Sequence, residues 1–203
     1  MRKRRPIPAV PPSSVESGRV LFDNALKASA EQLESFIETA DMQFAALSRP
    51  CNFGVFISDV DQTQTAIDTA KEVTFTETQL AENVTLDGSP QSRITIRAAG
   101  VYNFQFSIQI ASSNSNAQYV WIWPRLNGLD VPNSATEISI SSNSAKIVPA
   151  WNFVFPMRVG DYFELMWATS STNVTLEHFA PTAFCPAVPS VILTVNQAGR
   201  LAV

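Results

Sequence analysis

Residues 102–110 alternate strictly between apolar and polar side chains. The apolar positions are Tyr102, Phe104, Phe106, Ile108 and Ile110. Because successive side chains of a strand point to opposite faces, this pattern predicts a half-buried strand. Shorter apolar runs recur at residues 93–97, 119–123, 137–141, 151–155, 162–168, 173–177 and 191–195. Turn-forming pairs such as Asn127-Gly128 separate them. We therefore expect a β-sandwich or jelly roll over residues 51–197.

A different period precedes the strands. Between residues 26 and 47 the apolar side chains are spaced alternately four and three residues apart, which is the heptad repeat. This stripe consists of Leu26, Ala30, Leu33, Ile37, Ala40, Phe44 and Leu47. The pattern predicts one α-helix within residues 14–50, with Pro50 as its stop signal. An isolated helix is marginal, so we expect packing on its own sandwich, on other copies, or on another protein.

The first residues have the composition of an arm. Arg2, Lys3, Arg4 and Arg5 form a basic run, and a proline-rich stretch that favours extended geometry follows. The planar fork of arginine suits carboxylate or phosphate partners. We interpret residues 1–13 as an arm that anchors the protein to a partner, and the alternative is a solvated tail. Residues 198–203 form a short C-terminal tail.

Several strands are apolar on both faces. Residues 119–123 are five bulky apolar side chains in succession, and two apolar residues lie opposite the core positions of the 162–168 strand. Only 16% of the 203 residues are charged, against roughly 25% in an ordinary soluble domain. Such surfaces mark interfaces, although the helix or a long loop is an alternative cover. The candidate subunit interface consists of Tyr119, Trp121, Trp123, Tyr162 and Met166.

Three segments carry a resemblance to a known family. Residues 100–107 (GVYNFQFS) resemble the glycine–aromatic strand of C1q-like domains, residues 126–128 (LNG) resemble the next hairpin, and residues 159–165 (VGDYFEL) resemble the family's Gly-Asp strand signature. The resemblance implies a C1q/TNF-like jelly roll that forms compact homotrimers. The strand after Gly160-Asp161 would lie near the threefold axis, with Tyr162 and Met166 towards neighbours. The family's calcium-binding residues cannot be placed here, so calcium is not expected.

The closing segment at residues 189–197 resembles the ends of bacteriophage virion proteins that carry such domains. This resemblance implies a virion structural protein, assembled in the host cytoplasm. It would be a trimeric capsid decoration protein, or a fibre or appendage component, bound to other virion proteins through its N-terminal segment. The alternative is a receptor-binding tip that recognises a glycan or protein on the host surface.

Candidate chemistry is sparse. Cys51 and Cys185 are too few for a disulfide scaffold or a zinc site, and the sequence leaves open whether they pair. The one histidine, His178, has no nucleophile motif near it. Glu164 and Glu177 are the one pair of carboxylates that we weigh as glycosidase-like. We expect no enzyme activity and no cofactor. The net charge of −4 and the lack of a long apolar run predict neither nucleic-acid nor membrane binding.

Overall fold

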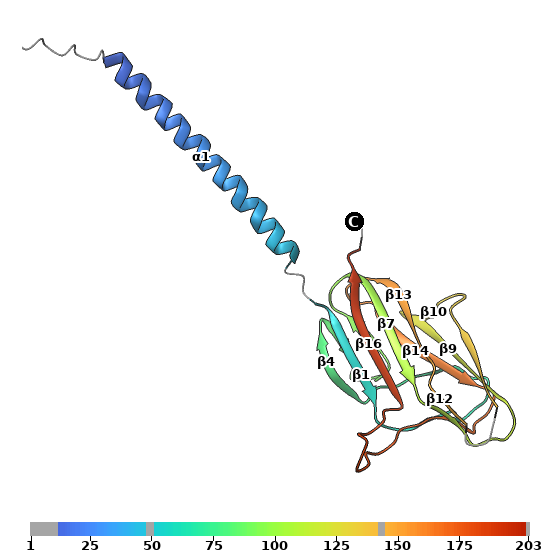
Figure 1. Ribbon diagram of the computed structural model, residues 1–203. Helices are drawn as coiled ribbons and strands as arrows, with labels where there is room; N and C mark the ends of the chain where they lie inside the picture. The colour runs from blue at the N-terminus through green and yellow to red at the C-terminus, as the bar shows by residue number, and fades with distance from the viewer. Residues whose placement is uncertain (1–11, 48–50, 142–144, 202–203) are drawn as a thin grey trace, which may run out of the picture. The chain divides into compact units, whose positions relative to one another are not determined.

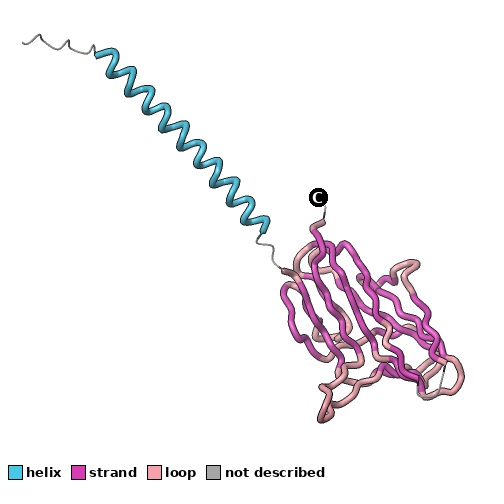
Figure 2. Tube along the Cα trace, viewed as in Figure 1, coloured by secondary structure: helices cyan, strands magenta, loops and turns pink. Residues whose placement is uncertain are grey.

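The computed structural model describes residues 12–47, 51–141 and 145–201. The chain falls into two compact units, divided between Pro50 and Cys51. The first unit holds the single helix α1 (Pro12–Leu47), so the helix that the heptad spacing predicts is present. The second unit is made of antiparallel strands (Figures 1 and 2).

Three sheets form the second unit. The first sheet has the order β13 (Ala150–Met157), β7 (Gly100–Ile108), β16 (Val191–Gly199), β1 (Phe53–Ser58) and β4 (Glu77–Glu82). The second has the order β10 (Leu129–Asp130), β9 (Gln118–Leu126), β14 (Tyr162–Thr169), β6 (Ile94–Ile96) and β5 (Val84–Leu86), with β11 (Thr136–Ile140) on β9 and β3 (Lys71–Glu72) on β14. The third, smaller sheet has the order β12 (Ala145–Ile147), β8 (Ile110–Ser112), β15 (Val174–Leu176) and β2 (Gln62–Thr63).

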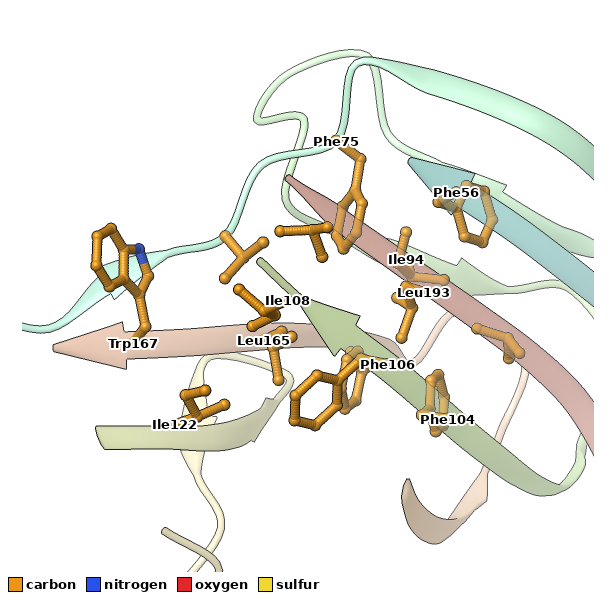
Figure 3. Close-up of a cluster of buried hydrophobic side chains, with 14 of the residues drawn as sticks. Phe56, Phe75, Ile94, Phe104, Phe106, Ile108, Ile122, Leu165, Trp167 and Leu193 are labelled. Carbon is orange, nitrogen blue, oxygen red and sulfur yellow. The ribbon is translucent and has the colours of Figure 1, made fainter. Parts of the chain in front are cut away.

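The core lies between the first two sheets. The apolar positions of β7 point inward, as the alternation predicts, and Tyr102, Phe104 and Phe106 are buried. The ring of Phe104 stacks on that of Phe163 of β14, with centroids 4.2 Å apart, so the two inner faces meet directly. Figure 3 shows this cluster, in which Leu165 and Trp167 follow from β14. Buried aromatic rings of this kind contribute much of the stability of a sandwich.

Two predicted turns are joined to each other. Asn127 and Gly128 both have positive φ, 49° and 79°, and they link β9 to β10. The side chain of Asn127 accepts a hydrogen bond from the Tyr162 backbone N–H (2.9 Å) and donates one to Asp161 (2.9 Å). Gly160 in the neighbouring turn has φ 90°, a region that glycine adopts without strain. These bonds fix the start of β14 against the end of β9.

Both cysteines are free thiols, Cys51 exposed and Cys185 half-buried, which answers the pairing that the sequence left open. Over the part of the chain that the structure describes, α1 included, no helix has the length and apolar character needed to cross a membrane.

Candidate interaction surfaces

The helix exposes its predicted stripe. Leu26, Leu33 and Ile37 are 56%, 60% and 50% exposed, and Ala40 is half-buried. The side chains of Phe44 and Leu47 lie outside the described residues. Large apolar side chains elsewhere on the helix, such as Leu21 and Phe36, are exposed as well, so the packing role of the stripe stays a prediction.

The outward face of the first sheet has no charged residue among its described positions on four adjacent strands. The register of β1, β16, β7 and β13 places these side chains on one surface, which we call the charge-free face. Its members are Phe53, Val55, Ile57, Ile192, Thr194, Asn196, Val101, Asn103, Gln105, Ser107, Ala150, Asn152, Val154 and Pro156. All of them are half-buried or exposed.

Asparagines connect three strands of the charge-free face. Asn152 of β13 donates to Asn103 of β7 at 2.7 Å, and Asn103 donates to Asn196 of β16 at 3.2 Å. Among the five strands of this sheet, only β4, at the edge opposite β13, carries charged residues, which are Glu77 and Glu82. Solvent-exposed faces of antiparallel sheets are usually rich in polar residues, so a wide face with amides but without charges has the composition of an interface.

The edge strand β13 adds aromatic surface beside this face. Trp151, Phe153 and Phe155 point towards the core but are only half-buried, and neighbouring rings lie 6.4 Å and 6.1 Å apart. The Trp151 indole N–H has no acceptor among the described residues. The sequence pattern predicts an ordinary strand at 151–155 and does not by itself indicate the charge-free face. The absent charges at its polar positions were the available signal.

The outward face of the second sheet is different. Tyr119 is exposed, and Trp121 and Trp123 are half-buried. Trp121 Nε1 donates to Glu137 at 2.8 Å, and Trp123 Nε1 donates to Asp130 at 2.9 Å. These aromatic side chains therefore lie among carboxylates, where the sequence predicts an apolar subunit contact.

Asp130 belongs to an ionic cluster on the same face. Its Oδ1 lies 2.8 Å from Nε of Arg125, and Nη1 of Arg125 lies 3.3 Å from Glu72. The hydrogen bonds from Arg125 and Trp123 hold the pKa of the Asp130 carboxyl below its usual value. The hydrogen bond to Asp130 likewise raises the pKa of Arg125. Both groups are charged at neutral pH, so the cluster persists there.

The two remaining residues of the predicted interface lie elsewhere. Met166 is fully buried within the chain, so it offers no surface to a neighbouring subunit, and the expectation that it faces one is wrong. β14 is an inner strand between β9 and the pair β3 and β6, and the chain itself covers Met166 on its outward side. Tyr162 is half-buried, with the Arg93 guanidinium 4.5 Å from its ring centroid.

The two carboxylates that the sequence singled out for chemistry are each held by a different cation. Glu164 is buried and accepts from Ser92 (3.0 Å) and Arg93 (3.3 Å). Glu177 pairs with Lys146 at 2.7 Å. His178 uses its backbone N–H to bind Asp61 at 2.7 Å. No group of three or more metal-ligating side chains occurs in the described ranges. Both carboxylates are therefore engaged in ion pairs within the chain.

Arg2, Lys3, Arg4 and Arg5, the predicted anchoring residues, lie outside the described residues. The prediction for the arm therefore stays a prediction.

No protein-family model matches the chain, and no curated protein matches it. Among solved structures, it is similar to the tumour necrosis factor Eiger of S. frugiperda, with a TM-score of 0.50, 11% identity, and coverage of 76% of this chain and 97% of that one. The globular domain of the zebrafish complement 1qA protein matches with a TM-score of 0.47, 12% identity and coverage of 74% and 99%. The sandwich is a C1q/TNF-like jelly roll preceded by one helix, as the resemblance predicted.

Proposed function

We propose that this chain is a non-enzymatic structural protein of a bacteriophage virion that works as a homotrimer. It would serve as a capsid decoration protein or as a component of a fibre or appendage. C1q/TNF-like domains are typically homotrimeric, and the closing segment at residues 189–197 supports the virion setting. The charge-free face is the observation that carries the proposal.

The physical argument concerns what this face can do in water. The cores of protein interfaces are depleted of charged residues, whereas the rest of a protein surface is not. The charge-free face spans four strands. On the inward side of the edge strand β13, three aromatic side chains are only half-buried. The occupant we assign to it is a second copy of the chain. Subunit contact thus falls on the first sheet, and the predicted contact through Tyr119, Trp121, Trp123 and Tyr162 is the rival arrangement.

The asparagine bonds suit such a contact. Asn103, Asn152 and Asn196 already bind one another within one chain, so little of their hydrogen-bonding capacity is lost when water leaves. Buried amides that keep their partners carry little penalty, while unpaired ones are expensive. A hydrogen-bonded amide row can also fix the register of two copies, as single buried asparagines do in coiled coils.

The helix and arm complete the proposal. Leu26, Leu33 and Ile37 of three copies would pack together as a short coiled coil, or would dock on another virion protein. Arg2 to Arg5 would bind carboxylate or phosphate groups on the protein that receives the arm. The protein would assemble in the host cytoplasm and act in the virion.

The test of the trimer is a charge placed on the charge-free face. Gln105 is exposed at its centre, between Thr194 of β16 and Asn152 of β13 in the register. Gln105→Glu keeps the shape and adds a carboxylate, so three copies would bury unpaired like charges, which is strongly unfavourable. The expected result is a trimer mass for the wild type and a monomer mass for Gln105→Glu, measured by light scattering.

Gln91→Glu is the matched control, because Gln91 is exposed in a loop outside the face; it should leave the trimer intact. A companion measurement compares the full chain with residues 51–203 and shows whether the helix adds to association. A wild-type chain that stays monomeric at high concentration would refute the proposal.

A receptor-binding tip is the second candidate function. The observation that favours it is a cavity at Trp121 and Trp123 on the second sheet.

A further inference from the structure

A cavity of about 650 Å³ opens on the outward side of the second sheet. Trp121 and Trp123 of β9 line it, together with Ala168 of β14 and residues of the segment between β10 and β11. We call it the tryptophan pocket. The subunit contact that we propose lies on the other sheet, so the trimer leaves the pocket without a role.

Both indoles are fixed by their edges. The N–H group of Trp121 is bound to Glu137 and that of Trp123 to Asp130, and Arg125 holds Asp130 in turn. A tryptophan whose polar edge is already bonded offers a ligand mainly its flat apolar face. Two rigid aromatic side chains also lose little conformational entropy on binding. The pocket is thus prepared before a ligand arrives.

The small side chain of Ala168 accounts for the space in the pocket. Ala168 pairs with Trp121 in the register of β14 and β9, whereas Met166 pairs with Trp123. The small side chain at position 168 leaves space beside the indole that a longer one would fill. Ala168 lines the cavity.

The rim carries oxygen and amide groups. Asp68 and Asn133 line the cavity from loops in which both residues have positive φ, 52° and 57°. Ser134 also lines it, and its hydroxyl donates to the Val131 carbonyl at 2.7 Å, which holds the loop in shape. Asp130 uses Oδ1 for both of its contacts, and Oδ2 makes no hydrogen bond among the described residues. Acceptors and donors therefore surround two aromatic faces.

We propose that the tryptophan pocket binds a neutral saccharide. The C–H faces of a pyranose ring stack on indole faces, while its hydroxyl groups bind carboxylates and amides at the rim, and few other ligands combine both properties. Ligand pockets in general join apolar walls to a few placed polar groups. The carboxylates of Asp68, Asp130 and Glu137 disfavour an acidic sugar. This inference deepens the receptor-binding candidate and needs neither the arm nor the trimer.

A second copy of the chain fits this surface poorly. Interface cores are depleted of charge, whereas here Glu137 and Asp130 bind the indole N–H groups and Arg125 binds Asp130. The surface is also an open depression of about 650 Å³, which offers room for a saccharide of a few rings.

The test is calorimetric titration of the full-length protein with maltohexaose, isomaltohexaose and chitohexaose, with hexagalacturonate as the acidic counterpart. The expected result is saturable binding of at least one neutral hexasaccharide and none of hexagalacturonate. Trp123→Ala should weaken this binding on the order of tenfold or more, as the loss of a central aromatic anchor does. The matched control is Phe184→Ala, which removes a 91% exposed aromatic side chain that does not line the pocket, and it should bind as the wild type does.

Ala168→Leu is the second variant. It keeps both tryptophans and fills the hollow, so it should also abolish binding, and its thermal unfolding shows that the fold is retained. Absence of saturable binding by all three neutral probes overturns the inference, as does unchanged binding in both variants. If Trp123→Ala converts the trimer to a monomer, the saccharide inference is also overturned, because the indoles would then form the subunit contact. The mass of the Gln105→Glu variant distinguishes this outcome from a wrong assignment of the subunit contact to the first sheet.

Discussion

Replacing Leu33 of α1 by alanine should weaken the trimer if the helices associate through the heptad stripe. Leu33 is 60% exposed in one copy, and burying a whole leucine side chain contributes roughly 1.5–3 kcal/mol. Burial of the exposed part is therefore worth about 1 kcal/mol per chain after allowance for the methyl group that alanine retains, and about 3 kcal/mol per trimer. Since each 1.4 kcal/mol is a factor of ten, the trimer dissociation constant should rise roughly a hundredfold.

The control for this prediction is Leu21→Ala in the same helix. Leu21 is 71% exposed, and at about 100° per residue it lies roughly 140° around the helix from Leu26. Both changes put the best helix former in place of a good one, so helix propensity does not separate them. Sedimentation equilibrium over a dilution series measures both variants. Equal dissociation constants for the two, or a larger change for Leu21→Ala, would show that the stripe is not the contact.

Two further predictions concern the arm and the core. Deletion of residues 2–13 should leave soluble trimers that no longer join particles, and wild-type occupancy on particles would contradict the anchoring role. The Tyr102 phenol donates a hydrogen bond to the Ala98 carbonyl at 2.6 Å, and burial raises its pKa. The folded state therefore favours the neutral phenol. Its contribution to stability is present below the ordinary pKa of 10.0 and is lost as the pH rises above that value. Tyr102→Phe should lose about 1 kcal/mol of unfolding free energy at neutral pH. Its unfolding free energy should also fall less steeply with pH in alkaline solution than that of the wild type. Denaturation curves that show the same pH dependence for both proteins would count against this account.

The strands and the helix were predictable because their patterns are periodic and strong. Alternation over residues 102–110 placed Phe104 and Phe106 in the core, and the heptad spacing placed α1. Asn127-Gly128 and Gly160 mark turns because glycine and asparagine tolerate positive φ. The strand β4 was not predicted. All its side chains are exposed, so its sequence lacks the apolar–polar alternation that marks a half-buried strand.

The interaction surfaces were harder to predict, because a residue's identity does not say which neighbour covers it. Met166 sits on the outward side of its strand, as expected, but the chain itself covers it. The sequence predicts Trp121 and Trp123 as part of a subunit interface, but their bonds to Glu137 and Asp130 depend on strands paired across the sheet. The charge-free face joins residues from four strands that span positions 53 to 196, and only the register brings them together.

The two outward faces of the sandwich differ in a way that assigns them different partners. On the first sheet, asparagines bind one another and no described outward position of β13, β7, β16 and β1 is charged. This composition suits contact with an identical surface, because like charges never meet. On the second sheet, carboxylates hold two indoles beside a hollow, and identical copies brought together there would oppose carboxylate to carboxylate. Self-association on the first face, as we propose, would leave the second face free for a ligand.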